Sequence, residues 1–135
     1  MHRQPTEHHV LLVTANEGRQ IQLTRLLGRA GYGVIPAVSP REALHYLAQA
    51  PAAWAQAPAV MLVDQESLGV AASRIIRAVR NAELELPMVV VSAFGAADDV
   101  IACLRAGAAD YISLPAEPAQ ILDVLARVVA APTVT

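Results

Sequence analysis

The sequence predicts an α/β protein in which a parallel β-sheet is covered by helices on both faces. Short apolar runs alternate with segments of helical periodicity along most of the chain, which is typical of βαβ units with right-handed crossovers. The runs at residues 59–63 and 88–92 are apolar at nearly every position, as expected for parallel strands that are buried on both sides. A chain of 135 residues has room for about one such domain.

Five segments are predicted as strands. They are Val10–Val13, Gly33–Val38, Ala59–Val63, Met88–Ser92 and Tyr111–Leu114. Five βα units fit a flavodoxin-like three-layer sandwich with a sheet of strand order 2-1-3-4-5, whereas a closed barrel would need eight units. We place this domain at residues 9–130. Residues 1–8 are predicted to be an extended or disordered segment, and residues 131–135 a tail or the start of a linker.

The helices between these strands carry start and stop signals. Asn16 can cap the first helix, which should end before Gly31. Ser39, followed by Pro40 and Glu42, has the pattern of a capping box with proline at the first helical position. The remaining helices are predicted at residues 71–81, 97–107 and 118–129.

The composition excludes several classes of function. A formal net charge of -2 gives no electrostatic basis for binding nucleic acid. The longest apolar runs fall far short of the roughly 18 residues that a membrane span needs, and no signal peptide is visible. Cys103 is the single cysteine, so no intrachain disulfide can form and a cytoplasmic location is expected.

Functional residues are expected where the predicted strands end. In an open α/β sheet, ligands bind beyond the carboxyl ends of the strands, at the point where the strand order reverses. Thr14, Ala15 and Asn16 follow the first strand, Asp64 follows the third, Ser92 ends the fourth and Leu114 ends the fifth. We therefore expect these six residues to form one constellation.

Four motifs around these positions resemble the receiver domain of bacterial response regulators. They are Val10-Leu-Leu-Val-Thr-Ala-Asn, Val60-Met-Leu-Val-Asp, Val89-Val-Val-Ser-Ala and Gly107-Ala-Ala-Asp-Tyr-Ile-Ser-Leu-Pro115. The last is the most specific, because receivers commonly carry Gly-Ala-x-Asp-Tyr, two further residues and then Lys-Pro. The resemblance covers about residues 9–130. It implies that Asp64 is the phosphoacceptor position, served by a histidine kinase, and that Ser92 and Tyr111 are switch positions.

Three departures from the receiver pattern weaken the expected chemistry. Receivers carry two acidic residues after the first strand, which bind magnesium, and here those positions are Thr14 and Ala15. The family lysine is Leu114, and all ten basic residues of the chain are arginines. Phosphoryl transfer depends on positioning and on charge neutralisation by the metal, and each lost interaction is worth about 2–4 kcal/mol at a preorganised site. We therefore expect a degenerate pocket that the usual magnesium-dependent route does not phosphorylate.

Alternatives remain for the carboxylates of this pocket. We favour an Asp64 that accepts backbone N–H bonds and holds its loop; the alternative is a phosphoacceptor with impaired metal binding, for which magnesium would be the cofactor. Glu17 and Glu66 are weak candidates for a rebuilt magnesium site. We favour Glu17 as a first-turn helix carboxylate and Glu66 as an exposed loop residue, with no bound metal or cofactor.

The sequence thus predicts a signalling module and not an enzyme. No glycine-rich phosphate loop follows the first strand, and no catalytic Ser-His-Asp or Cys-His arrangement falls at the strand ends. We expect an atypical receiver that binds a protein partner or forms a homodimer. A phosphorelay receiver acting with a histidine kinase is the alternative, and a flavodoxin-like domain that binds a small molecule is a third hypothesis.

The helix predicted at residues 118–129 is unusually apolar. Its apolar residues occupy many directions around the helix axis, more than a narrow inward stripe requires. We expect Val124, Leu125 and Val128 to contribute to an interface together with the helix at residues 97–107 and the fifth strand. The alternative is a helix that is fully seated on the sheet.

Overall fold

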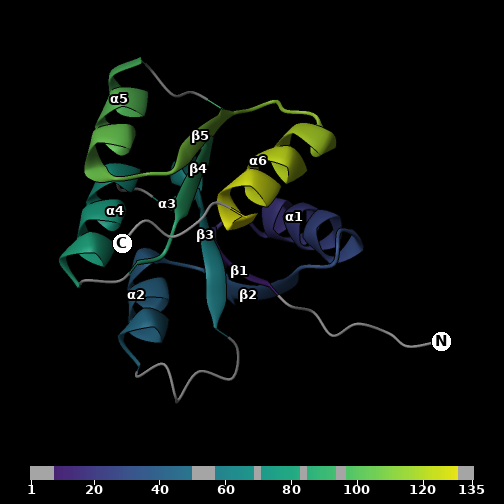
Figure 1. Cartoon of the computed structure of the whole chain (residues 1–135), viewed down its shortest axis with the longest axis horizontal. Coiled ribbons are helices and arrows are strands. Elements are labelled where there is room, and N and C mark those ends of the chain that lie inside the picture. The colour runs from purple at the N-terminus through teal and green to yellow at the C-terminus, as the bar shows by residue number, and fades with distance from the viewer. Residues whose placement is uncertain (1–7, 50–56, 69–70, 83–84, 94–96, 131–135) are drawn as a thin grey trace.

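The computed structural model describes residues 8–49, 57–68, 71–82, 85–93 and 97–130. Five parallel strands form one sheet of order β2-β1-β3-β4-β5 (Figure 1). They are β1 (His9–Val13), β2 (Gly33–Ala37), β3 (Pro58–Asp64), β4 (Met88–Ser92) and β5 (Asp110–Ser113). The predicted fold and strand order are confirmed, and each strand boundary agrees with its prediction to within one residue.

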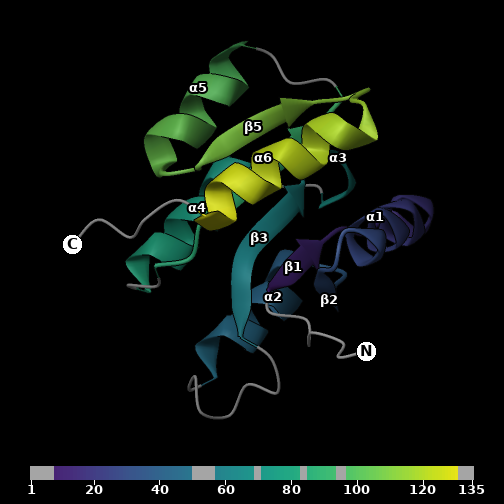
Figure 2. The same cartoon turned by 45° about the vertical axis from the view of Figure 1, so that its right-hand side comes forward.

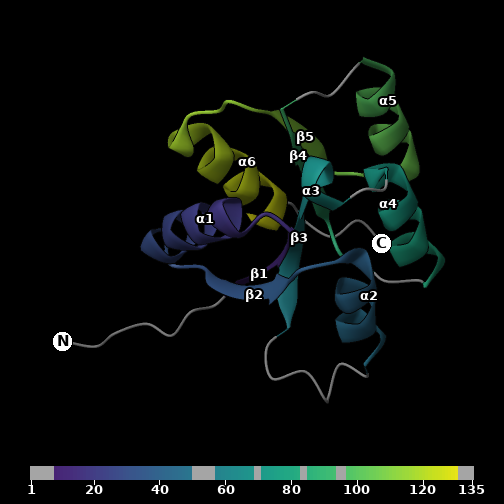
Figure 3. The same ribbon diagram turned by 180° about the vertical axis from the view of Figure 1, so that it is seen from behind.

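Helices cover both faces of this sheet. They are α1 (Glu17–Arg29), α2 (Pro40–Ala48), α3 (Gln65–Leu68), α4 (Ala72–Asn81), α5 (Ala97–Ala106) and α6 (Pro118–Ala130). Helices α1 and α6 lie on one face, and α2, α4 and α5 lie on the other (Figures 1 and 3). The short helix α3 was not predicted. It follows β3 directly and lies at the carboxyl edge of the sheet (Figure 3).

The predicted helix caps are present. The Asn16 side chain accepts a hydrogen bond of 2.8 Å from the backbone N–H of Arg19, and the Ser39 hydroxyl accepts one of 3.1 Å from that of Glu42. Glu42 reaches back to the N–H of Val38 at 3.3 Å, one residue before the cap. These bonds satisfy donors that a helix start leaves unpaired.

The core has two layers because neighbouring side chains of a strand point to opposite faces of the sheet. One layer lies under α2, α4 and α5, and its fully buried members include Leu11, Met61, Val63, Ile76 and Met88. The other lies under α1 and α6, and its fully buried members include Leu12, Leu27, Val60, Leu62 and Leu125. In the turned view of Figure 2, β1 and β3 run side by side between these layers. The central strands therefore contribute to both layers.

The expectation that Val124 and Leu125 form an interface is wrong. Val124 is 7% exposed and Leu125 is 0% exposed, and Val128 is partly buried against the same layer. With Ile121, these residues have the spacing i, i+3, i+4 and i+7, which is one inward stripe of a helix. Helix α6 is therefore seated on the sheet.

Two expected segments fall largely outside the described residues. These are the extended segment at residues 1–8, of which the structure describes residue 8, and the tail at residues 131–135. Within the part of the chain that is described, no helix has the length and apolar character that crossing a membrane requires.

Replacing Leu125 by alanine should lower the free energy of unfolding by about 2–5 kcal/mol, because the substitution opens a cavity in the core. Leu104→Ala removes the same atoms from a side chain of α5 that is 46% exposed, and it should cost roughly 1 kcal/mol or less. Urea denaturation followed by circular dichroism measures both values. Equal losses for the two variants would contradict the seating of α6.

Candidate functional site

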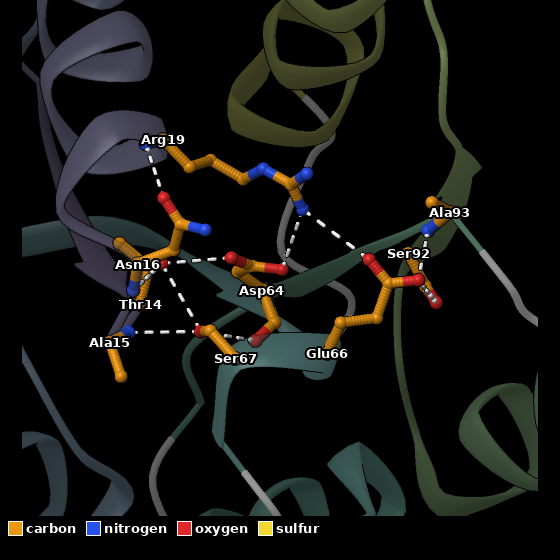
Figure 4. Close-up of polar contacts among 9 residues, drawn as sticks. All are labelled: Thr14, Ala15, Asn16, Arg19, Asp64, Glu66, Ser67, Ser92 and Ala93. Carbon is orange, nitrogen blue, oxygen red and sulfur yellow. Dashed lines mark hydrogen bonds and ion pairs between the residues drawn. The ribbon is translucent and has the colours of Figure 1, made fainter.

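Three buried polar residues meet at the carboxyl edge of the sheet. Thr14 follows β1, Asp64 ends β3 and Ser92 ends β4, and they are 2%, 0% and 1% exposed. Strands β1 and β3 flank the point where the strand order reverses, so the edge is the predicted one. Figure 4 shows that side chains from the first turns of α1 and α3 join them there.

The Asp64 carboxylate is held by two side chains. The Thr14 hydroxyl donates a hydrogen bond of 2.8 Å to Oδ2 of Asp64, and Nη1 of Arg19 donates one of 3.0 Å to Oδ1. We expected backbone N–H donors, and that expectation is wrong for these two bonds. A fully buried carboxylate needs such a charged partner, since an unpaired charge is costly to bury.

Arg19 reaches this carboxylate from the first turn of α1. The Asn16 cap fixes the Arg19 backbone N–H, and the side chain then extends across the carboxyl edge towards Asp64 (Figure 4). Arg19 was not among the site residues that the sequence predicted. Its position in the first turn of a helix was nevertheless a signal of a specific role, because the positive end of a helix favours acidic residues and disfavours arginine.

Glu66 is exposed, as we expected, but it lies in α3 and not in a loop, and it is a member of the site. Its side chain is 25% exposed. Its Oε2 accepts hydrogen bonds from the Ala93 backbone N–H at 2.7 Å and from the Ser92 hydroxyl at 3.3 Å. Its Oε1 lies 3.5 Å from Nη1 of Arg19. The expectation of a loop residue failed because α3 turns the chain immediately after β3, which directs Glu66 towards the end of β4 (Figure 4).

A hydroxyl network connects the loop after β1 to α3. The Ser67 hydroxyl donates to the Asp64 carbonyl oxygen at 3.2 Å and accepts from the Ala15 backbone N–H at 2.9 Å. It also lies 3.2 Å from the Thr14 hydroxyl oxygen. Thr14 and Ala15 thus participate through hydrogen bonds and contribute no charged group.

Leu114 gives the other side of the site an apolar wall. It is half-buried, and its backbone N–H donates to the Ser92 carbonyl oxygen at 2.9 Å. With Arg19, Leu23 and Ile121, it lines a cavity of about 550 Å³ between α1 and α6. The side chain at this position therefore offers no charge to an anion near Asp64.

Tyr111 and Glu17 do not join the hydrogen-bond network. The Tyr111 ring packs against the core layer under α2, α4 and α5. Its hydroxyl is buried and has no hydrogen-bond partner among the described residues. Glu17 is exposed in the first turn of α1, where a carboxylate is favourable.

The donor set around Asp64 does not fit a magnesium ion. Magnesium prefers an octahedron of oxygen ligands, but the Arg19 guanidinium contacts both nearby carboxylates, those of Asp64 and Glu66. In the described part of the chain, no group of three or more His, Cys, Asp or Glu residues could hold a metal ion. A guanidinium therefore supplies the positive charge beside Asp64.

Cys103 is not a nucleophile in this structure. Burial raises the pKa of the Cys103 thiol, and the Asp99 carboxylate raises it further, while a hydrogen bond with the backbone of Ser73 lowers it. The net shift is upward, so the protonated and unreactive form predominates at neutral pH.

Comparisons with known proteins agree on one family. The model of the response regulator receiver domain matches residues 3–126. The response regulator protein FleR of Pseudomonas aeruginosa is 29% identical over 118 residues, which cover 87% of this chain and 24% of FleR. The chain thus spans about a quarter of the length of that relative.

Solved structures show the same fold. The non-phosphorylated HemR receiver domain of Leptospira biflexa has a TM-score of 0.80 at 22% identity, covering 96% of this chain and 99% of that one. A response regulator of Thermotoga maritima has a TM-score of 0.75 at 23% identity, with coverages of 92% and 98%.

Arg19 and Asp64 should be energetically coupled. In a double-mutant cycle with Arg19→Gln and Asp64→Asn, we expect a coupling energy of about 0.5–3 kcal/mol, because each single change removes the charged partner of the other. Urea denaturation of the wild type and the three variants measures it. Arg25→Gln, on the exposed side of the same helix, is the control and should combine additively with Asp64→Asn. Additivity in the Arg19 cycle as well would contradict the ion pair.

Proposed function

The chain belongs to the family of response regulator receiver domains, and we propose that it is an atypical member that signals without magnesium-dependent phosphorylation of Asp64. Receivers of this family interact with histidine kinases and other proteins, and we assign this chain the role of a protein interaction or dimerisation module, not an enzyme. The observation that carries the proposal is the position of Arg19, whose Nη1 lies 3.0 Å from Asp64 and 3.5 Å from Glu66.

The contacts of Asp64 disfavour its action as a phosphoacceptor. Phosphoryl transfer needs a positioned nucleophilic oxygen and cations that neutralise the developing charge. Both Asp64 oxygens already accept hydrogen bonds, one from Thr14 and one from Arg19. An acceptor oxygen paired with a guanidinium is a weaker nucleophile. The chain offers no further cation at Leu114 and no metal-binding carboxylates at the end of β1.

A second candidate function is supported by Asp64 itself. A carboxylate stands at the phosphoacceptor position, and Ser92 provides a hydroxyl at the end of β4. Arg19 could stabilise phosphoryl oxygens as a charged donor. The protein would then be a phosphorelay receiver that accepts phosphate slowly from a histidine kinase, and one experiment separates the two functions.

Incubation with acetyl phosphate and magnesium should leave the protein unmodified, because no metal site is provided and one Asp64 oxygen is paired with the Arg19 guanidinium. Intact-mass spectrometry at successive times measures the modification. A phosphorylatable receiver treated in parallel is the positive control, and Asp64→Asn is the negative control. Near-stoichiometric addition of one phosphoryl group to the wild type, absent from Asp64→Asn, would establish the phosphorelay function instead.

The surface of α5, β5 and α6 is the proposed interaction face. Ile101 and Leu104 of α5 are both 46% exposed, and residues three apart lie on the same side of a helix. Exposed large apolar side chains that lie together are favourable in an interface. Asp110 and Arg127 form an ion pair of 3.7 Å between β5, an edge strand of the sheet, and α6. A homodimer is the simplest partner arrangement.

The protein should self-associate through this face at micromolar concentration, independently of magnesium and acetyl phosphate. Sedimentation velocity over a concentration series measures the association. Leu104→Glu should weaken it by at least roughly tenfold, since the change places a charge in an apolar contact. Ile21→Glu alters an equally apolar side chain of α1 that is 44% exposed and should have little effect. A strict monomer at high micromolar concentration would exclude the homodimer and leave a different protein as the partner.

A further inference from the structure

Three hydrogen-bond donors converge on the carboxylate of Glu66. The Ala93 backbone N–H is 2.7 Å from Oε2, the Ser92 hydroxyl is 3.3 Å from Oε2, and Nη1 of Arg19 is 3.5 Å from Oε1. Two donors come from the end of β4 and the third comes from α1. None belongs to the segment that carries Glu66, so the carboxylate bridges elements far apart in the sequence (Figure 4).

These donors have the chemistry of a site for a small oxyanion. A backbone N–H, a hydroxyl and a guanidinium are the groups that bind carboxylate or phosphate oxygens, and their bonds to a charged acceptor are the strong ones. Ser92 is 1% exposed, so its hydroxyl donates from a largely water-free position. With Glu66 in place, the three charged side chains carry one positive and two negative charges, which disfavours any further anion.

We infer that Ser92, Ala93 and Arg19 form an oxyanion-binding site whose ligand is the chain's own Glu66. The inference rests on the proposed function, in which Asp64 carries no phosphoryl group. It identifies the Glu66 carboxylate as the anion that binds the end of β4 instead. Glu66 is two residues from Asp64, and its tether gives it an effective concentration that a dilute external anion cannot match. The Ser92 hydroxyl, at the expected switch position, is therefore hydrogen-bonded to Glu66 in the absence of any phosphodonor. This supports the proposal that the protein signals without phosphorylation of Asp64.

Removing the Glu66 carboxylate should vacate the site for an external oxyanion. The probes are acetate, which replaces the missing carboxylate, and inorganic phosphate, with chloride at equal ionic strength as the control. The Ala93 amide signal in two-dimensional ¹H–¹⁵N spectra reports occupancy directly. In Glu66→Ala, this signal should move from its wild-type position and return towards it as acetate or phosphate is added, with saturation. In the wild type, the same additions should leave it unchanged.

Matched variants separate this site from a general effect of charge. Glu17→Ala removes an exposed carboxylate of α1, and it should leave the Ala93 signal and the anion response as in the wild type. Ser92→Ala in the Glu66→Ala background should weaken phosphate binding roughly tenfold, the effect of losing one donor to a charged acceptor. Glu66→Gln keeps the size of the side chain and tests the charge alone if the alanine variant does not fold, and in it the Ala93 signal should also shift.

Three results would overturn the inference. They are an Ala93 signal that is the same in the wild type and both Glu66 variants, a Glu66→Ala variant without saturable anion binding, and a wild type that binds the anions as tightly as the variant. No phosphodonor is used, so these outcomes are independent of whether acetyl phosphate modifies wild-type Asp64.

Discussion

The guanidinium of Arg19 is the group on which the carboxyl edge of the sheet depends. It lies between the fully buried carboxylate of Asp64 and the partly exposed carboxylate of Glu66. Two carboxylates beside one another repel, and burying a carboxylate without a partner costs free energy. One planar cation with several donors satisfies both. Its position follows from the Asn16 cap, so the start of α1 determines how the ends of β3 and β4 are connected.

Hydrogen bonds from uncharged groups accompany this ion pair. Thr14 donates to Asp64, and Ser67 connects the Asp64 carbonyl oxygen to the backbone of Ala15. The ends of β1 and β3 are thus joined by two hydroxyl groups, those of Thr14 and Ser67. Buried polar networks of this type define one arrangement of the chain more than they add to its stability.

Local patterns were sufficient to predict the sheet and the place of the site. Strands such as Met88–Ser92 are continuous apolar runs, and parallel strands bring Thr14, Asp64 and Ser92 to one edge whatever their side chains do. Helix α3 has four residues, too few to show any periodicity, and so the direction of Glu66 could not be predicted.

Contacts made by long side chains also could not be predicted from the sequence. The contact between Arg19 and Asp64 depends on how far a flexible side chain extends across the edge, and spacing along the chain contains no information on that. Val124 and Leu125 illustrate a different error. Their helix is apolar on several sides, and the inward stripe became evident only when the sheet beneath it was known.

Because Arg19 provides the positive charge beside Asp64, this charge is covalently attached to the chain. A magnesium ion exchanges with solution, so its occupancy follows the concentration of the free ion and falls in the presence of a chelator. Arg19 has no such equilibrium, because its guanidinium is covalently attached to the chain. The positive charge beside Asp64 is therefore fixed by the sequence, and changes in the ionic composition of the solution do not remove it. A movement of the Arg19 side chain or of α1, or a substitution at residue 19, would alter it.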